Sequence, residues 1–465
     1  MKTIRIGAGL GFYGDSWRPV RASIERGGVQ YIASDHLSEL TLAILQKDRQ
    51  RDRPGNPPSG YARDAVPMLA ELWPIAAKHG VKFVLNAGGL NPEGARLAIA
   101  RTFRDKGWKA KIATVTGDSV LERIDELRAA GEALAHMDTG TGIAGVRERL
   151  LFASAYLGAQ PIAEALARGA DIVLTGRVAD AALTLGPLAH EFGWRWDDWD
   201  RIAAGLTLGH LLECSGQGSG GNFGSAHEWA LVPDYAHLGY PIAEVQADGR
   251  AVFTKPPGTG GRVSFDTVRQ QLLYEVHNPH AYYSPDVVLD MGTLEFEDEG
   301  DDRVRISGAS GAPRPKTLKI VAGYQDGWMG SGIMGFAWPE AYAKCEKAAE
   351  VLRTLVEENK RERGWAVEEI NAEYIGYNSL LGANADPTYR DQLNECFLRM
   401  TIRTKDKKVA DAFGRLFPWL GLSGPPYVGS MKGVQPAKEL LGIWPTLVTR
   451  ELIESKVEIS MEEIK

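Results

Sequence analysis

The sequence has few cysteines and no long apolar segment, and both absences narrow the class of protein. Its three cysteines, Cys214, Cys345 and Cys396, lie far apart and form no CxxC pair. They exclude a disulfide framework and a zinc ribbon, and they fit a reducing compartment. The N-terminus has no apolar stretch of signal-peptide type, and no apolar run is long enough to span a bilayer. We therefore expect a cytoplasmic protein that has no membrane partner.

Positive charge is scarce as well. Lysine and arginine number 53 against 60 aspartates and glutamates, which gives a formal net charge of −7. A nucleic-acid surface needs a clustered positive field, so we expect no nucleic acid partner. The chain has 465 residues, more than a single core usually holds. We expect two domains, one over residues 1–240 and one over residues 241–465.

The first half repeats a β-branched run, a glycine-rich turn and a helical stretch. The repeated segments begin with TIRIGAG, VQYIASDH, VKFVLNAGG, KIATVTGDS and ADIVLTGRVAD. Strands that alternate with helices in this way predict an α/β fold with a doubly wound, mostly parallel, Rossmann-like sheet. Beyond residue 240, a hairpin pattern (YPIAEVQADGRAVFTKPP) and a long amphipathic helix (WPEAYAKCEKAAEVLRTLVEENKRER) indicate an α+β C-terminal domain.

The stretch IGAGLGFYGD contains Gly9, Gly11 and Gly14 at the spacing of a dinucleotide-binding loop. Asp35, which ends the second strand, stands where a ribose-binding acid would lie. Asp15, however, places a negative charge where a pyrophosphate would dock at the helix N-terminus. We therefore expect this loop to let the backbone approach a substrate, with Asp15 as the helix cap. An NAD(P)-dependent oxidoreductase remains the alternative.

Ligands of doubly wound sheets bind beyond the carboxyl ends of the strands, where this sequence is polar and rich in glycine. Asp35 and Asp118 are the candidate general bases there, because hydration or proton abstraction needs a carboxylate near the substrate. Asn86 is a candidate for polarising a carbonyl group in an oxyanion hole. The amides of Gly88 and Gly89 would complete that hole.

Arg177 and Asp180 lie three residues apart at the start of a helix. Arg177 is a candidate for binding a substrate carboxylate through its guanidinium fork, with Asp180 beside it. The alternative is an internal ion pair between the two that only stabilises the turn.

The segment HLLECSGQGSGGNF is unusually rich in glycine. His210 and Glu213 share a helix face, which suits either two metal ligands, an acid–base pair or simple packing. Because no third ligand has a recognisable spacing, we predict no metal site and take Glu213 as a candidate acid–base group. Gln217 and Asn222 are candidate amide donors to the substrate. Arg262, in the loop KPPGTGGRVS, is a candidate anion-binding residue.

Several of these motifs, in their order along the chain, resemble the acyclic terpene utilisation (AtuA) family. They are IGAGLGFYGD, YIASDHLSELTLA, VLNAGGLNP, VTGDSV, ADIVLTGRVADAALTLGPL, HLLECSGQGSGGNF, GGRVSFDTVRQQLLYEV and SPDV. The resemblance implies a part in the bacterial breakdown of branched acyclic isoprenoids such as citronellol and geraniol, through acyl-CoA esters. It carries over no catalytic residue. Many similar proteins have an added ferredoxin-like C-terminal domain, for which this chain has no room.

The residues and the resemblance together predict an enzyme of branched acyclic isoprenoid acid catabolism. We expect it to act on a small carboxylic acid or its acyl-CoA thioester as a lyase or hydratase, and to form a homo-oligomer. The sequence requires no cofactor beyond a CoA thioester substrate. A non-catalytic partner subunit of an acyl-CoA enzyme is a second alternative to this prediction.

Overall fold

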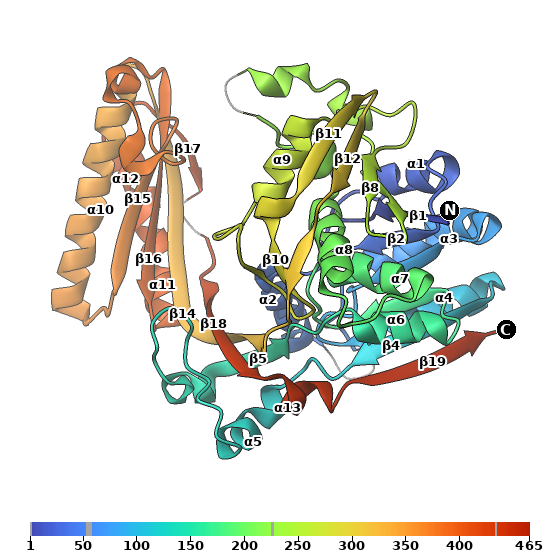
Figure 1. The fold of residues 1–465 in the computed structure, drawn as a ribbon. Coiled ribbons are helices and arrows are strands. Elements are labelled where there is room, and N and C mark those ends of the chain that lie inside the picture. Colours follow the sequence, from blue (N-terminus) through green and yellow to red (C-terminus); the bar gives the residue numbers. More distant parts are fainter. Residues whose placement is uncertain (1, 53–57, 225–226, 433–434) are drawn as a thin grey trace. The chain divides into compact units, whose positions relative to one another are not determined.

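The computed structural model describes residues 2–52, 58–224, 227–432 and 435–465. The chain forms two compact units (Figure 1). The first consists of Met1–Gly323 together with Ile443–Lys465, and the second of Tyr324–Gly442. The second unit is therefore an insertion in the chain of the first. No helix among the described residues is long and apolar enough to cross a bilayer.

A ten-stranded sheet forms the centre of the first unit. Along the sheet, the strands follow the order β11 (Glu295–Gly300), β12 (Arg303–Ser307), β8 (Ala251–Thr254), β7 (Ile242–Gln246), β1 (Thr3–Ala8), β2 (Tyr31–Ser34), β3 (Lys82–Leu85), β6 (Ile172–Thr175), β4 (Ala110–Thr116) and β19 (Glu458–Ile464). The last strand of the chain thus lies beside β4, far from it in sequence (Figure 1).

The sheet is mixed, and the predicted Rossmann-like doubly wound arrangement is not confirmed. Strands β1, β2, β3, β6 and β4 are mutually parallel, as the repeated pattern predicts. Strand β7 pairs antiparallel with β1, and β19 pairs antiparallel with β4. The hairpin after Tyr240 therefore extends the first sheet, and the predicted boundary at residue 240 falls inside the first compact unit.

Two rows of helices pack on the parallel strands. Helices α1 (Arg18–Arg26), α3 (Ala65–His79) and α4 (Pro92–Lys106) contact one another in one row. Helices α6 (Gln160–Ala167), α7 (Ala182–Phe192) and α8 (Trp199–Leu212) form the other. All residues of β2 and β6 are buried. Right-handed crossovers explain the two rows, because the chain moves along the sheet in one direction from β1 to β4 and returns to reach β6.

Local sequence signals fix several helix starts. Asn91 caps α4 by accepting a hydrogen bond from the Gly94 amide at 2.9 Å, and a proline occupies the first turn. Ser264 forms a capping box at the start of α9 (Phe265–Leu273). The helical stretch that follows Asp118 begins with a 3-10 turn at Leu121–Arg123, which leads into the short helix α5 (Ile124–Ala129).

The second unit has the strand–helix–strand–strand–helix–strand connectivity of ferredoxin-like folds. Its sheet has the order β15 (Glu369–Ile375), β16 (Glu395–Thr404), β14 (Thr317–Ala337) and β17 (Val428–Lys432), with all three pairings antiparallel. The long amphipathic helix predicted from the sequence is α10 (Ala341–Arg363), and its apolar side packs in a core with β16, α11 (Lys407–Phe413) and α12 (Phe417–Ser423). The unit with this connectivity lies within the chain rather than after it.

Other described elements complete the first unit. They are α2 (Glu39–Gln50), β5 (Leu150–Ala155), β9 (Tyr282–Tyr283), β10 (Val288–Asp290), β13 (Ser310–Ala312) and α13 (Arg450–Glu454). Strands β14 and β18 (Lys438–Thr449) run from one unit into the other. Strand β5 pairs with β14, and the Tyr156 amide donates to the Lys319 carbonyl at 2.9 Å. This pairing brings residues near 156 and 319 together in the first unit.

Candidate functional site

The end of β2 and the end of β3 are joined by buried hydrogen bonds. The side-chain Nδ2 of Asn86 donates to Asp35 Oδ1 at 2.6 Å, and the side-chain Oδ1 of Asn86 accepts from the His36 backbone amide at 2.7 Å. Asp35 Oδ1 also accepts from the Leu37 amide at 2.9 Å. All three side chains, Asp35, His36 and Asn86, are buried. As positioned, Asn86 holds Asp35 in place.

The ends of β4 and β6 are joined in the same way. Asp118 Oδ2 accepts from the Arg177 amide at 2.9 Å, and both residues are buried. A Cβ atom on Gly176 would lie 2.3 Å from Asp118 Oδ1, so the close approach of the two loops requires glycine there. Arg177 Nη1 donates to Asp180 Oδ1 at 2.6 Å, which is the internal ion pair that the sequence left open.

The glycine-rich loop after β1 is filled by the protein's own carboxylates. The Gly11 amide donates to Asp15 Oδ2 at 3.0 Å, and the Gly14 amide donates to Asp64 Oδ2 at 2.8 Å. Asp15 does not cap α1, which begins at Arg18 without a side-chain cap; it binds the loop instead. Gly9 is required by packing, because a Cβ atom there would lie 2.4 Å from Ser34 Cβ. These amides are therefore already paired where a pyrophosphate would need them.

Two of the groups expected to form an oxyanion hole, the Asn86 side-chain amide and the Gly89 amide, are engaged within the protein. The Gly89 amide donates to the Asn86 carbonyl at 3.2 Å, and Gly88 accepts from the Asn91 amide at 2.8 Å. A Cβ atom on Gly88 would lie 2.4 Å from the Thr175 carbonyl oxygen. The two glycines thus let this turn pack against the end of β6.

A pocket of about 500 Å³ lies beside this network, wholly within the first unit. Its lining includes the buried small and apolar side chains of Ala181, Leu206 and Leu318, together with the nearly buried acid Glu213 and the partly exposed acid Asp180. Exposed side chains, among them Met137, Tyr283 and Leu447, surround its opening. The complete lining is Met137, Tyr156, Ala179, Asp180, Ala181, Leu206, Glu213, Tyr282, Tyr283, Ser284, Pro285, Pro315, Thr317, Leu318, Lys319 and Leu447.

Glu213 forms a buried pair with His210 at the end of α8. His210 Nδ1 lies 2.9 Å from Glu213 Oε1. His210 Nε2 must carry a proton, because its partner at 2.9 Å is the Leu272 carbonyl oxygen, which can only accept. A further proton must therefore lie between Nδ1 and Glu213. The pair thus shares a proton, and its glutamate lines the pocket.

Tyr156 forms a wall of the pocket between two cations. Its ring centre lies 4.1 Å from the Arg177 guanidinium carbon and 4.8 Å from Lys319 Nζ. Its hydroxyl donates to Glu39 Oε1 at 2.6 Å, and Lys319 Nζ lies 3.5 Å from the same oxygen. The aromatic ring therefore separates the buried Arg177 from the pocket while Lys319 stays at its edge.

Burial sets the protonation of the acids around the pocket. It raises the pKa of Asp35, an effect that nearby Asp180 reinforces and Arg177 opposes. It also raises the pKa of Glu213, although His210 favours the charged carboxylate. Burial raises the pKa of Asp118 to about 6 despite hydrogen bonds from backbone amides. For His210, burial acts to lower the pKa, but Glu213 and the Leu272 carbonyl outweigh it and the pKa is raised.

The structure places three predicted binding residues away from the pocket lining. Asn222 Nδ2 donates to Gln217 Oε1 at 3.3 Å, and the Arg262 amide donates to the Ser219 carbonyl at 2.8 Å. These residues order the loop that follows α8. In contrast, Asp35, Asn86, Asp118, Arg177, Asp180 and Glu213 all belong to the strand-end network or to the pocket beside it.

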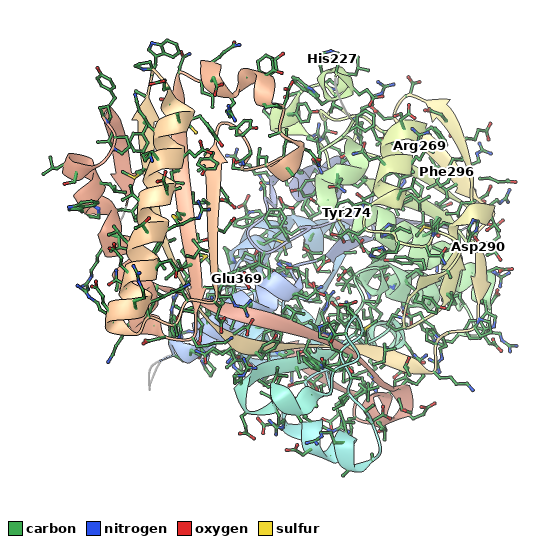
Figure 2. All side chains as sticks on the ribbon, turned by 90° about the vertical axis from the view of Figure 1, so that its left-hand side faces the viewer. His227, Arg269, Tyr274, Asp290, Phe296 and Glu369 are labelled. Atoms are coloured by element: carbon green, nitrogen blue, oxygen red, sulfur yellow. The ribbon has the colours of Figure 1, made fainter. Side chains whose placement is uncertain are left out.

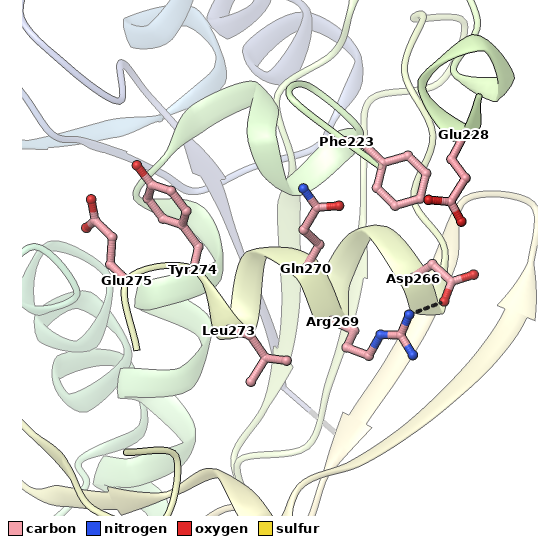
Figure 3. A pocket seen from close by; sticks show the side chains of 8 residues that line it. All are labelled: Phe223, Glu228, Asp266, Arg269, Gln270, Leu273, Tyr274 and Glu275. Carbon is pink, nitrogen blue, oxygen red and sulfur yellow. Dashed lines mark ion pairs between the residues drawn. The ribbon is translucent and has the colours of Figure 1, made fainter. Parts of the chain in front are cut away.

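A second hollow of about 530 Å³ lies along α9 (Figure 3). The dashed line in Figure 3 marks the ion pair between Arg269 and Asp266, whose atoms lie 3.0 Å apart. Both side chains are more than half exposed. Arg269 also lies over the ring of Phe265, which in turn packs edge-on against Phe296 of β11. Figure 2 labels Arg269 and Phe296 on this surface. This surface contains none of the predicted strand-end residues, so we place the candidate site in the pocket beside Glu213.

Sequence reasoning missed Tyr156, Tyr282 and Lys319. Tyr156 follows β5, Tyr282 belongs to β9, and Lys319 belongs to β14, so all three reach the pocket by tertiary pairing. The resemblance motif SPDV hinted at this region, since Ser284 and Pro285 line the pocket. Asp286 of that motif is structural, because it accepts from the Ala159 amide at 3.0 Å beside the start of α6. Within the described part of the chain, no group of three or more His, Cys, Asp or Glu residues is arranged to hold a metal ion.

The model of the family described as acyclic terpene utilisation family protein AtuA matches residues 4–459. No curated protein and no solved structure matches the chain. The family match spans both compact units.

Proposed function

The chain belongs to the acyclic terpene utilisation family AtuA, and from this premise we propose that it is an enzyme of branched acyclic isoprenoid acid catabolism. The family implies a part in acyclic terpene utilisation. Our proposal is that the protein acts on a small branched acid or its acyl-CoA thioester as a lyase or hydratase. The observation that carries it is the Glu213–His210 pair at the wall of an otherwise mostly apolar pocket.

The pocket suits a branched hydrocarbon chain. Its volume of about 500 Å³ falls in the range of ordinary ligand sites. Leucine, alanine, proline and methionine supply half of the lining residues, and burial of apolar carbon against them favours binding by about 25 cal/mol per Å². The exposed rim by Lys319 and Tyr283 would let the polar end of a long thioester extend into solvent.

Glu213 has the position and the protonation behaviour of a proton-transfer group. In hydration, its carboxylate would take a proton from water as the water oxygen bonds to the β-carbon, and would deliver a proton to the α-carbon of the acyl group. The lyase or dehydration direction reverses these steps. His210 would hold Glu213 in place and share its proton, since its other nitrogen is fixed on the Leu272 carbonyl. Asp35, Asn86, Asp118 and Arg177 would support the loop that carries Asp180.

Proton transfer in heavy water tests this proposal. The protein is incubated in D₂O with CoA thioesters of saturated and unsaturated acyclic terpenoid acids, and deuterium in the acyl group and hydration are measured by mass spectrometry. The wild type should incorporate deuterium or hydrate at least one thioester, and Glu213→Gln should lower that rate by about 10²-fold or more. Glu463→Gln, at an exposed glutamate of β19 outside the pocket lining, is the matched control and should keep the rate. An inactive wild type, or a Glu213→Gln variant as active as the wild type, would refute the proposal.

A further inference from the structure

Acidic residues outnumber basic residues in the described lining of the pocket. Asp180 and Glu213 are acids of the lining, and among the described residues of the lining Lys319 is the single cation. Asp35 stands behind them, close enough to Asp180 for the two charges to interact. Glu39 lies beside Lys319 at 3.5 Å. The one cation of the lining is therefore already partnered by a carboxylate.

The other positive groups are turned to the protein. Arg177 Nη1 donates to Asp180 and to the Leu37 carbonyl, and Tyr156 covers the guanidinium. Both ring nitrogens of His210 are occupied, one by Glu213 and one by the Leu272 carbonyl. A ligand carboxylate beside Asp180 and Glu213 would thus meet two further acids without a free cation of the lining to bind it.

We infer that the head group bound beside Asp180 and Glu213 is neutral: a carbonyl or hydroxyl oxygen on an apolar branched chain, as in a thioester or an alcohol, and not a free carboxylate. This inference rests on the proposed function and specifies its substrate class. It selects the thioester over the free acid as the form on which the pocket acts.

The pocket contains hydrogen-bonding groups that suit a neutral oxygen. The Tyr282 side chain lines it and its ring lies 5.3 Å from that of His210. Burial, with the nearby charge of Glu213, raises the pKa of Tyr282. Its phenol therefore stays protonated and can donate a hydrogen bond to a carbonyl oxygen. Ser284 lies in the same lining.

Binding of three ligands with one hydrocarbon skeleton tests this inference. Geranate, methyl geranate and geraniol are titrated into the full-length protein by calorimetry at pH 8, where geranate is ionised. The methyl ester or the alcohol should bind at least about tenfold more tightly than the carboxylate, the factor that corresponds to ~1.4 kcal/mol of repulsion. Glu213→Gln and Asp180→Asn should each narrow this ratio, whereas Glu463→Gln, at an exposed position outside the lining, should leave it unchanged.

The outcomes separate this inference from the proposed function. Geranate that binds as tightly as the ester, or more tightly, would overturn the neutral head group while proton transfer in D₂O could still be observed. A ratio that stays the same in both Glu213→Gln and Asp180→Asn would also overturn it. If neither the neutral ligands nor the carboxylate binds, the pocket is not the substrate site and both proposals fail.

Discussion

Asp118 shows how burial and hydrogen bonding together set the chemistry of one carboxyl group. Its oxygen accepts from the Arg177 amide, yet burial raises its pKa to about 6. An aspartate in the unfolded chain titrates near 3.9. Between about pH 4 and pH 6, the folded protein therefore holds a proton there that the unfolded chain has released. The stability from that proton is complete below about pH 4 and is lost as the pH rises through about 6.

Asp118→Asn should remove this part of the pH dependence. Urea denaturation between pH 4 and pH 7 measures it, and the free energy of unfolding of the wild type relative to the variant should fall by about 2 kcal/mol as the pH rises. Asp105→Asn, on the exposed surface of α4, is the control and should give a difference that does not change with pH. Parallel curves for the wild type and Asp118→Asn would show that Asp118 is not buried as described.

Which residues of the site could be predicted depends on how they reach it. Asp35, Asn86, Asp118 and Arg177 directly follow strands, and the ends of parallel strands meet at one edge whatever their separation in sequence. Tyr156, Tyr282 and Lys319 reach the pocket through strand pairings that no local pattern encodes. The roles of these residues were harder to predict than their positions. For example, only the folded arrangement of the loops shows that the Asn86 side-chain amide donates to Asp35.

At the scale of elements, the strand-end loops fit together because glycine lets their backbones approach. Gly176 is the clearest example, since its missing side chain leaves room for the Asp118 carboxylate. Gly176→Ala should displace Asp118 and the Arg177 loop and cost about 1–3 kcal/mol of stability, the usual range for overpacking. Thermal and urea unfolding measure the loss.

Gly145→Ala is the matched control for this substitution. A Cβ atom there meets nothing within 4 Å, so the variant should unfold at nearly the same urea concentration as the wild type. Equal stability of Gly176→Ala and Gly145→Ala would contradict the tight packing of the two loops.

The elements themselves were well predicted where the pattern was periodic. The strands of the repeated βα pattern, the hairpin of β7 and β8 and helix α10 all appear where their sequences indicate them. The order of the strands in the sheet was harder to predict. Strands β7 and β19 pair antiparallel with the two edge strands of the parallel group, β1 and β4, from which they are distant in sequence. Their short alternating patterns do not say which strand they join.

At the scale of the whole molecule, all residues that line the pocket belong to the first compact unit. The second unit, Tyr324–Gly442, has its own apolar core between α10 and its sheet. A variant in which a short glycine–serine linker joins Gly323 to Ile443 should therefore keep the pocket. We expect methyl geranate to raise the unfolding temperature of this variant as it does that of the full chain, because ligand binding to the native state stabilises it.

Circular dichroism is the control for folding of the shortened variant. A shortened chain that is folded but shows no shift with the ligand would mean that the second unit contributes to the site.

The domain boundary could not be located from the sequence pattern. The change of character after Tyr240 reflects a change from parallel to antiparallel strands within one sheet. The inserted unit begins later, within the continuous strand β14.

The most direct test of the account is hydrogen–deuterium exchange of the full chain with and without methyl geranate. We expect the ligand to slow amide exchange around residues 177–181 and 282–285, which form or adjoin the pocket lining. Amide exchange in the loop at residues 9–15 should not change. Slower exchange in the loop at residues 9–15 without any change around residues 177–181 and 282–285 would contradict the placement of the site.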